Sequence, residues 1–85
     1  MIFTVLWRPL AEGQLAQLWM DAPDRDFVSA AADEIDSLLR RDPQLQGESR
    51  EGDARILIVP PLVALFEVNE DDRLVHVLEV WRPQQ

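Results

Sequence analysis

The chain has 85 residues, the size of one small domain, and sixteen acidic against eight basic residues give it a net charge of −8. That charge disfavours extensive direct binding to nucleic acid, and the lack of cysteine excludes disulfides and thiolate metal sites and fits a cytoplasmic location. The N-terminus does not resemble a signal peptide, and no apolar stretch approaches the ~20 residues of a membrane span, so we expect no membrane partner.

The N-terminal half predicts one strand followed by two amphipathic helices. Met1–Trp7 alternates between two faces, which predicts a strand that ends at Arg8-Pro9. Pro9–Met20 predicts a helix with an apolar face made of Ala11, Leu15, Leu18 and Trp19. Phe27–Arg41 predicts a second helix with an apolar stripe of Val28, Ala31, Ala32, Ile35, Leu38 and Leu39. Because their connection is short, we expect the helices to pack as an antiparallel hairpin.

The C-terminal half predicts closely spaced strands. Residues 44–54 are polar, and we expect one short edge strand around Glu48-Ser49-Arg50. Arg55–Arg82 contains three apolar runs separated by Pro60-Pro61 and by a polar turn at 69–72. Strands this close together pair antiparallel, because a parallel crossover needs a dozen or more residues. In the last run the apolar parity changes after Val77. A bulge near Val77-Leu78 explains this change, and the alternative is that both faces of the strand are partly covered.

These elements predict an α+β fold of order β-α-α-β-β-β, with the short edge strand as a further strand. We expect an antiparallel sheet with the helical hairpin packed on one face, in a single domain that spans residues 1–85. On the middle strand of the meander, Val63 and Leu65 alternate with the expected core residues. Apolar residues on both faces of that strand favour a binding partner on the face away from the helices, although ordinary lightly exposed residues explain them equally well.

Several ordered motifs resemble those of the RelE/ParE superfamily of bacterial toxins. The opening segment 3–11 resembles the family's first strand, proline and helix start, and 15–19 the apolar face of its first helix. Gly47, Arg50 and Arg55 resemble the glycine and arginines that enter its central hairpin. Segment 66–72 resembles the family's aromatic strand and the acidic turn after it, and segment 75–82 resembles its last strand. The resemblance covers nearly the whole chain.

This resemblance implies the toxin of a type II toxin–antitoxin pair, as in plasmid stabilisation proteins, neutralised by a cognate antitoxin that wraps it with helices or a strand. RelE-like members cleave messenger RNA on the ribosome, whereas ParE-like members poison DNA gyrase and are not nucleases. The chain departs from the RelE pattern, because Val63 stands where an arginine precedes the strand aromatic by three residues, and it has no Tyr and no Lys. We therefore favour a ParE-like protein that binds a protein target such as DNA gyrase.

The alternative is a RelE-like endoribonuclease that acts on the ribosome. Attack of a 2′-hydroxyl on phosphate requires an acid–base group and cationic stabilisation. Histidine is the residue type suited to that role near neutral pH, and His76 is the only one in the sequence. The candidate arginines for phosphate are Arg50, Arg55 and Arg82. We favour the simpler interpretation of His76 as a solvent-facing strand residue. One histidine and no cysteine predict no metal site, and no motif predicts a cofactor.

For a binding protein, the expected contacts to target or antitoxin are Arg50, Arg55, Val63, Leu65, Trp81 and Arg82. Arg50 and Arg55 contact a partner or form salt bridges with nearby acids, and both alternatives stay open. Arg82 either stacks on Trp81 or contacts a ligand. A third hypothesis is a non-toxic family member kept as a small binding domain.

Overall fold

The computed structural model of the protein describes residues 2–49 and 52–83, which form a five-stranded sheet and two helices. The elements follow one another as β1 (Thr4–Trp7), α1 (Pro9–Asp21), α2 (Arg25–Arg41), the short 3-10 helix η1 (Pro43–Leu45), β2 (Glu48–Ser49), β3 (Ala54–Val59), β4 (Leu62–Asn69) and β5 (Leu74–Trp81). The α+β class and the order of strand, two helices and further strands are confirmed.

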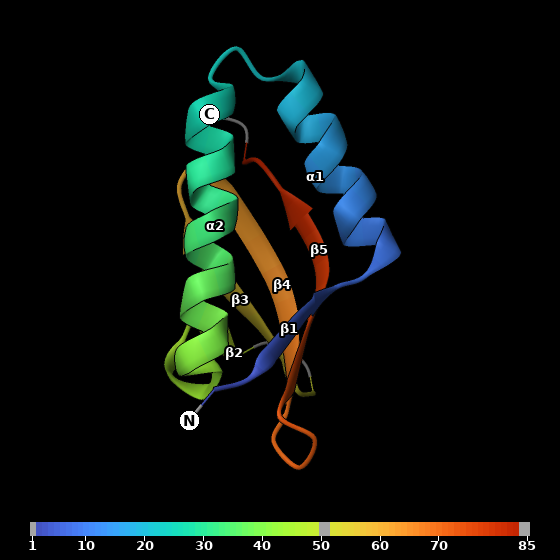
Figure 1. Cartoon of the computed structure of the whole chain (residues 1–85), viewed down its shortest axis with the longest axis vertical. Coiled ribbons are helices and arrows are strands. Elements are labelled where there is room, and N and C mark those ends of the chain that lie inside the picture. Colours follow the sequence, from blue (N-terminus) through green and yellow to red (C-terminus); the bar gives the residue numbers. More distant parts are fainter. Residues whose placement is uncertain (1, 50–51, 84–85) are drawn as a thin grey trace.

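The strands lie in the order β1-β5-β4-β3-β2 (Figure 1). The antiparallel pairing of β3, β4 and β5 confirms the predicted meander, and the two-residue β2 confirms the edge strand at Glu48-Ser49. Arg50, the third residue of that predicted strand, lies outside the described residues. The sheet is mixed rather than wholly antiparallel, because β1 pairs with β5 in parallel. Two helices and three strands separate these two segments along the chain, so a parallel crossover has ample length.

The predicted bulge accounts for the core face of β5. Phe66 pairs with Val77 while Leu65 pairs with Glu79, so Leu78 is the extra residue. The bulge lets β5 bury side chains of both parities against the helices. The fully buried side chains of the core include Leu62, Ala64, Phe66, Val75, Val77 and Val80 from the sheet and Val28, Ile35 and Leu39 from α2.

The two helices run in opposite directions but do not pack along their length as the expected hairpin. Figure 1 shows them diverging from their short connection, with β1 between their far ends. α1 lies mainly against β5, whereas α2 contacts β1, β3 and β4. Trp19, which we expected on the apolar face of α1, is 42% exposed. The helices therefore leave part of their facing surfaces uncovered.

Candidate functional site

Two of the three arginines predicted as phosphate or partner contacts are held by other parts of the chain. Arg55 lies on the helix-bearing face of the sheet, since it pairs with the core residue Phe66. Its Nε donates to the carbonyl of Gln46 at 2.9 Å and its Nη2 to the carbonyl of Gly47 at 3.2 Å. The Arg55 guanidinium thus fixes the loop that precedes β2.

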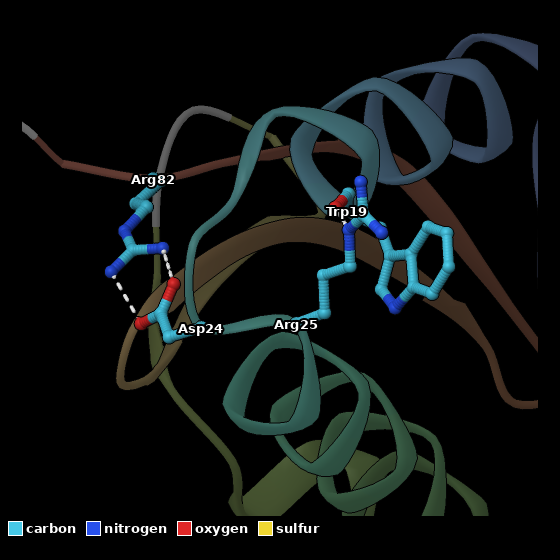
Figure 2. A network of polar contacts seen from close by, with 4 residues as sticks. All are labelled: Trp19, Asp24, Arg25 and Arg82. Atoms are coloured by element: carbon cyan, nitrogen blue, oxygen red, sulfur yellow. Dashed lines mark hydrogen bonds and ion pairs between the residues drawn. The ribbon is translucent and has the colours of Figure 1, made fainter.

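Arg82 forms a bidentate ion pair with Asp24, in the connection between the helices (Figure 2). The two guanidinium nitrogens donate to the two carboxylate oxygens at 2.7 and 2.8 Å. These hydrogen bonds lower the pKa of Asp24 below its ordinary value and raise the pKa of Arg82. Arg82 does not stack on Trp81, because successive strand residues point to opposite faces of the sheet. The pair ties the end of β5 to the start of α2.

Next to this pair, Arg25 closes the C-terminal end of α1. Its guanidinium donates to the carbonyls of Trp19 and Met20 at 3.0 Å each, and it lies over the Trp19 ring at 4.6 Å from the centroid (Figure 2). A cation that binds the last carbonyls of a helix also complements the helix dipole. Together the two arginines define the geometry of the interhelical connection.

His76 lies on the face of the sheet that the helices do not cover, which we call the outer face. It pairs with Glu67 on β4 and with Leu6 on β1, and it is half-buried. Arg82 is six residues away, about 20 Å along an extended strand, and it points to the opposite face. The structure therefore separates Arg82 from His76. Arg55 lines the same open hollow as His76, although its strand position is on the opposite face of the sheet. Arg50 lies outside the described residues.

Two residues that we did not predict lie near His76. Arg8 and Glu67 line the same open hollow of about 790 Å³ as His76, beside the β4–β5 turn. Arg55 and Val68, from the helix-bearing face of the sheet, also line it. We call Arg8, Glu67 and His76 the polar cluster. Sequence spacing gave little sign of it, because the three residues come from three strands or strand ends. Among the described residues, no group of three or more His, Cys, Asp or Glu side chains is placed to hold a metal ion.

The apolar residues predicted on the outer face form a continuous patch. Val63 pairs with Trp81 on one side and with Ile58 on the other, and the next row places Leu65 beside Ile56. Ile58 is 65% exposed and Trp81 38% exposed, while Val63 beneath them is only 5% exposed. We call this set the sheet-face patch: Ile56, Ile58, Val63, Leu65 and Trp81.

A groove of about 870 Å³ opens between the helices, on the other side of the sheet. Residues of β1 form its floor, and residues from the facing sides of α1 and α2 form its walls. The lining is mainly apolar, from Val5, Leu6, Trp7, Leu15, Ala16, Trp19, Met20, Val28 and Ala32. Three acidic residues also line it, namely Glu12, Asp33 and Asp36.

The floor of this groove is a strand edge. β1 is the last strand of the sheet on its side. The backbone N–H of Thr4 donates to the carbonyl of Arg73, in the turn before β5, at 2.9 Å. The backbone N–H of Arg8 donates to the carbonyl of Val77, in β5, at 3.0 Å. By strand alternation, the N–H and C=O groups of Val5 and Trp7 point away from β5. Such an edge is a template for a further strand.

The groove was not predicted, because the short connection between the helices favours a packed hairpin. Two signals were present in the sequence. Met20 is an apolar residue outside the predicted core stripe of its helix, and Ala16 and Ala32 are small residues that leave room where the helices separate. None of the helices in the described part of the chain is long and apolar enough to cross a membrane.

Comparison with known proteins gives matches to solved structures alone. No protein-family model matches the chain, and no curated protein matches it by sequence. A chain of the toxin–antitoxin complex RelBE2 from Mycobacterium tuberculosis is similar with a TM-score of 0.78 and 18% identity, over 100% of this chain and 95% of that one. A chain of the chromosomal ParDE system from P. aeruginosa gives a TM-score of 0.69 and 17% identity, over 98% of both chains.

A third similar structure is a chain of the intact RelBE toxin–antitoxin complex from E. coli, with a TM-score of 0.56 and 12% identity over 98% of this chain and 99% of that one. The resemblance noted in the sequence is thereby confirmed at the level of structure. This chain has the RelE/ParE toxin fold.

Proposed function

We propose that this chain is the toxin of a type II toxin–antitoxin pair, which acts by binding a protein target and is neutralised by an antitoxin. Its similarity to chains from three toxin–antitoxin systems supports the proposal, because it extends over nearly the whole length of every chain compared. The proposal treats residues 1–85 as a single RelE/ParE-like domain. A ParE-like action on a target such as DNA gyrase is its finer form.

The observation that carries the proposal is the groove between the helices. Its apolar lining, its acidic side chains and the free edge of β1 together fit an amphipathic segment with basic residues. Apolar anchors of that segment enter between the helices, and its basic groups meet Glu12 and Asp33. An antitoxin is the partner of this chemistry that the fold suggests.

Binding is favoured over RNA cleavage by the positions of the predicted catalytic groups. General acid–base catalysis requires the proton-transfer group within hydrogen-bond reach of the reacting atom, with cations around the phosphate. Arg82 is paired with Asp24 on the opposite face of the sheet from His76. Arg55 lines the same hollow as His76, but its guanidinium donates to the carbonyls of Gln46 and Gly47. For these arginines we propose a supporting role, in which they hold the loop before β2 and the interhelical connection. Val63, Leu65 and Trp81 remain proposed target contacts, and Arg50 remains a proposed contact from the sequence alone.

Groove-filling variants test the antitoxin assignment in a bacterial host with a co-expressed candidate antitoxin. Ala16 lines the groove and is exposed, so Ala16→Trp fills the space without disturbing the core. We expect Ala16→Trp to keep its growth arrest and lose its neutralisation. The matched control is Ala30→Trp, which adds the same volume at an exposed position of α2 outside the groove. Neutralisation of both variants would place the antitoxin elsewhere.

A second comparison in the same host separates binding from catalysis. We expect growth arrest to survive His76→Ala and cellular RNA to stay intact. Ribosome-dependent RNA breakdown that disappears in His76→Ala would replace the proposal by the RelE-like endoribonuclease. Absence of arrest by the wild-type chain, at good soluble yield, would favour a non-toxic family member.

A further inference from the structure

We infer that the sheet-face patch is a docking site for a basic protein surface, in which apolar anchors are flanked by Arg or Lys side chains. That the patch contacts the target rests on the proposed function. That it binds a basic, partly apolar surface follows from the residues of the outer face alone. The patch and the groove lie on opposite sides of the sheet. The outer-face site is therefore separate from the groove assigned to the antitoxin.

The apolar part of the site follows from strand register. Ile58, Val63 and Trp81 form one row across three adjacent strands, and Ile56 and Leu65 form the row beside it. Ile58 and Trp81 project from this surface, while Val63 is covered between them. Large aliphatic and aromatic side chains gathered on an uncovered sheet face are typical of protein interfaces.

The charged part of the site comes from two carboxylates on the same face. Glu79 is the cross-strand partner of Leu65, and Glu67 is the next residue of β4 on that face. The Nε2 of Gln14 approaches the Glu79 carboxylate at 3.5 Å, which holds that side chain at the rim of the patch. The cationic member of the polar cluster, Arg8, follows β1 and lies two strands away from Leu65.

These charges exclude the other classes of occupant. Phosphates of nucleic acids and of anionic lipids would be repelled by Glu67 and Glu79, on a chain whose net charge is already −8. A second copy in a two-fold arrangement would bring equivalent carboxylates and two net charges of −8 together, which like-charge repulsion opposes. A basic protein surface satisfies both the apolar and the acidic components.

An NMR titration of the isotope-labelled protein tests the chemistry directly. The probe is a short synthetic peptide of alternating Ile and Arg, and its counterpart has Glu in place of Arg. We expect the Arg peptide to shift the backbone resonances of Ile58, Leu65 and Trp81, with binding that weakens as salt is added. Ile58→Arg should weaken this binding by at least about tenfold. Leu45→Arg, which makes the same change at a 79% exposed position on η1, should leave it unaltered.

Each alternative has its own result in this experiment. Equal binding of the Glu peptide, shifts outside the patch, or an equal loss with Leu45→Arg would overturn the inference. Concentration-dependent shifts at the patch without peptide would assign it to a second copy, and patch shifts caused by an RNA oligonucleotide would assign it to nucleic acid.

Growth arrest connects the site to the proposed function. We expect Ile58→Arg to abolish arrest while it still binds the antitoxin, and Leu45→Arg to retain both properties. Arrest that persists in Ile58→Arg would overturn the role of the patch as target contact. A wild-type chain that causes no arrest but binds the Arg peptide at the patch would reject the proposed function and leave the basic-partner site standing.

Discussion

At Gly47 the backbone runs so close to β3 that there is no room for a side chain. A Cβ at this position would lie 2.1 Å from the carbonyl oxygen of Ile56, and the residue has a φ of +69°. The carbonyl of Gly47 also accepts a hydrogen bond from Arg55, so the same residue anchors the loop. Both its conformation and its lack of a side chain are required for β2 to reach the edge of the sheet.

We expect Gly47→Ala to lower the free energy of unfolding by at least about 2 kcal/mol, because left-handed strain is added to a clash with backbone. Gly52→Ala is the matched control. Gly52 also has a positive φ, of +65°, but a Cβ at its position would have no atom within 4 Å. Gly52→Ala should cost only about 1–2 kcal/mol from backbone strain. Urea denaturation followed by circular dichroism measures the free energy of unfolding of both variants. Equal losses would mean that β3 shifts away from the new side chain at position 47 without cost.

Asp24 gives the chain a pH-dependent contribution to stability. Its pKa in the folded protein is lowered from 3.8 by the hydrogen bonds from Arg82, so the folded state binds this proton less readily than the unfolded state. The pair therefore stabilises the fold above that ordinary pKa, and its contribution is lost as the pH falls through the lower folded value.

We expect Asp24→Asn to be less stable than the wild type at pH 7 and to approach it in stability below pH 3.8. Denaturation curves at several pH values measure the difference. The double variant with Arg82→Gln serves as the control, because it should add little to the single change. A difference that stays constant down to pH 3 would show that the ion pair is not its source.

At the scale of elements, α1 protects the part of β5 that β1 does not reach. β1 pairs with β5 over Leu74–Val77, and beyond that point Gln14 takes over. Its Oε1 accepts a hydrogen bond from the backbone N–H of Val80 at 2.8 Å. A helix side chain thus replaces a neighbouring strand at this edge.

We expect Gln14→Leu to cost about 1 kcal/mol and to speed hydrogen exchange at the Val80 amide. Gln17→Leu is the matched control on the same helix, because the Gln17 amide bonds only to the exposed Asp21 carboxylate. Exchange measured by NMR separates the two. An unchanged Val80 amide in Gln14→Leu would mean that the strand end is protected by other contacts.

Which elements could be predicted depended on how local their determinants are. The parity change after Val77 revealed the bulge, and the alternation around Val63 and Leu65 revealed the apolar outer face, because strand periodicity is written in neighbouring residues. The parallel pairing of β1 with β5 was not predictable, since it depends on which sheet edge the helices leave accessible. For the same reason the divergence of the helices, and with it the groove, was missed.

The residues of the candidate site also differ in how far the sequence alone could predict them. Val63 and Leu65 were predicted from the strand pattern, and Trp81 was named as a partner contact without it. The three residues share one surface. The ion pair between Asp24 and Arg82 joins residues 58 positions apart, so their spacing gave no sign of it. Arg55 and Arg82 were considered as ligands because arginine suits phosphate and carboxylate, and that chemistry is equally suited to the internal carbonyls and carboxylate that they bind.

At the scale of the whole molecule, the excess of acidic groups works against compactness. Sixteen carboxylates oppose eight arginines within a radius of gyration of 12.3 Å, so most like charges lie within about one to two Debye lengths at low salt. Self-repulsion is relieved on unfolding, because the charges then move apart.

We expect the melting temperature to rise by a few degrees between low and physiological salt, as screening reduces this repulsion. Asp33→Asn/Glu34→Gln, which removes two charges from the exposed part of α2, should show a smaller rise. Calorimetry at several sodium chloride concentrations gives the comparison. A melting temperature that falls with salt would mean that attractive pairs outweigh the repulsion.

The position of β5 has a consequence for the chain while it is being made. β5 lies between β1 and β4, yet it follows every other strand in the sequence. Until Leu74–Trp81 leaves the ribosome, the first strand has no neighbour and the hairpin of β3 and β4 has an open edge. The groove and the sheet-face patch both depend on strands that β5 joins, so neither surface exists on the nascent chain before its last strand emerges.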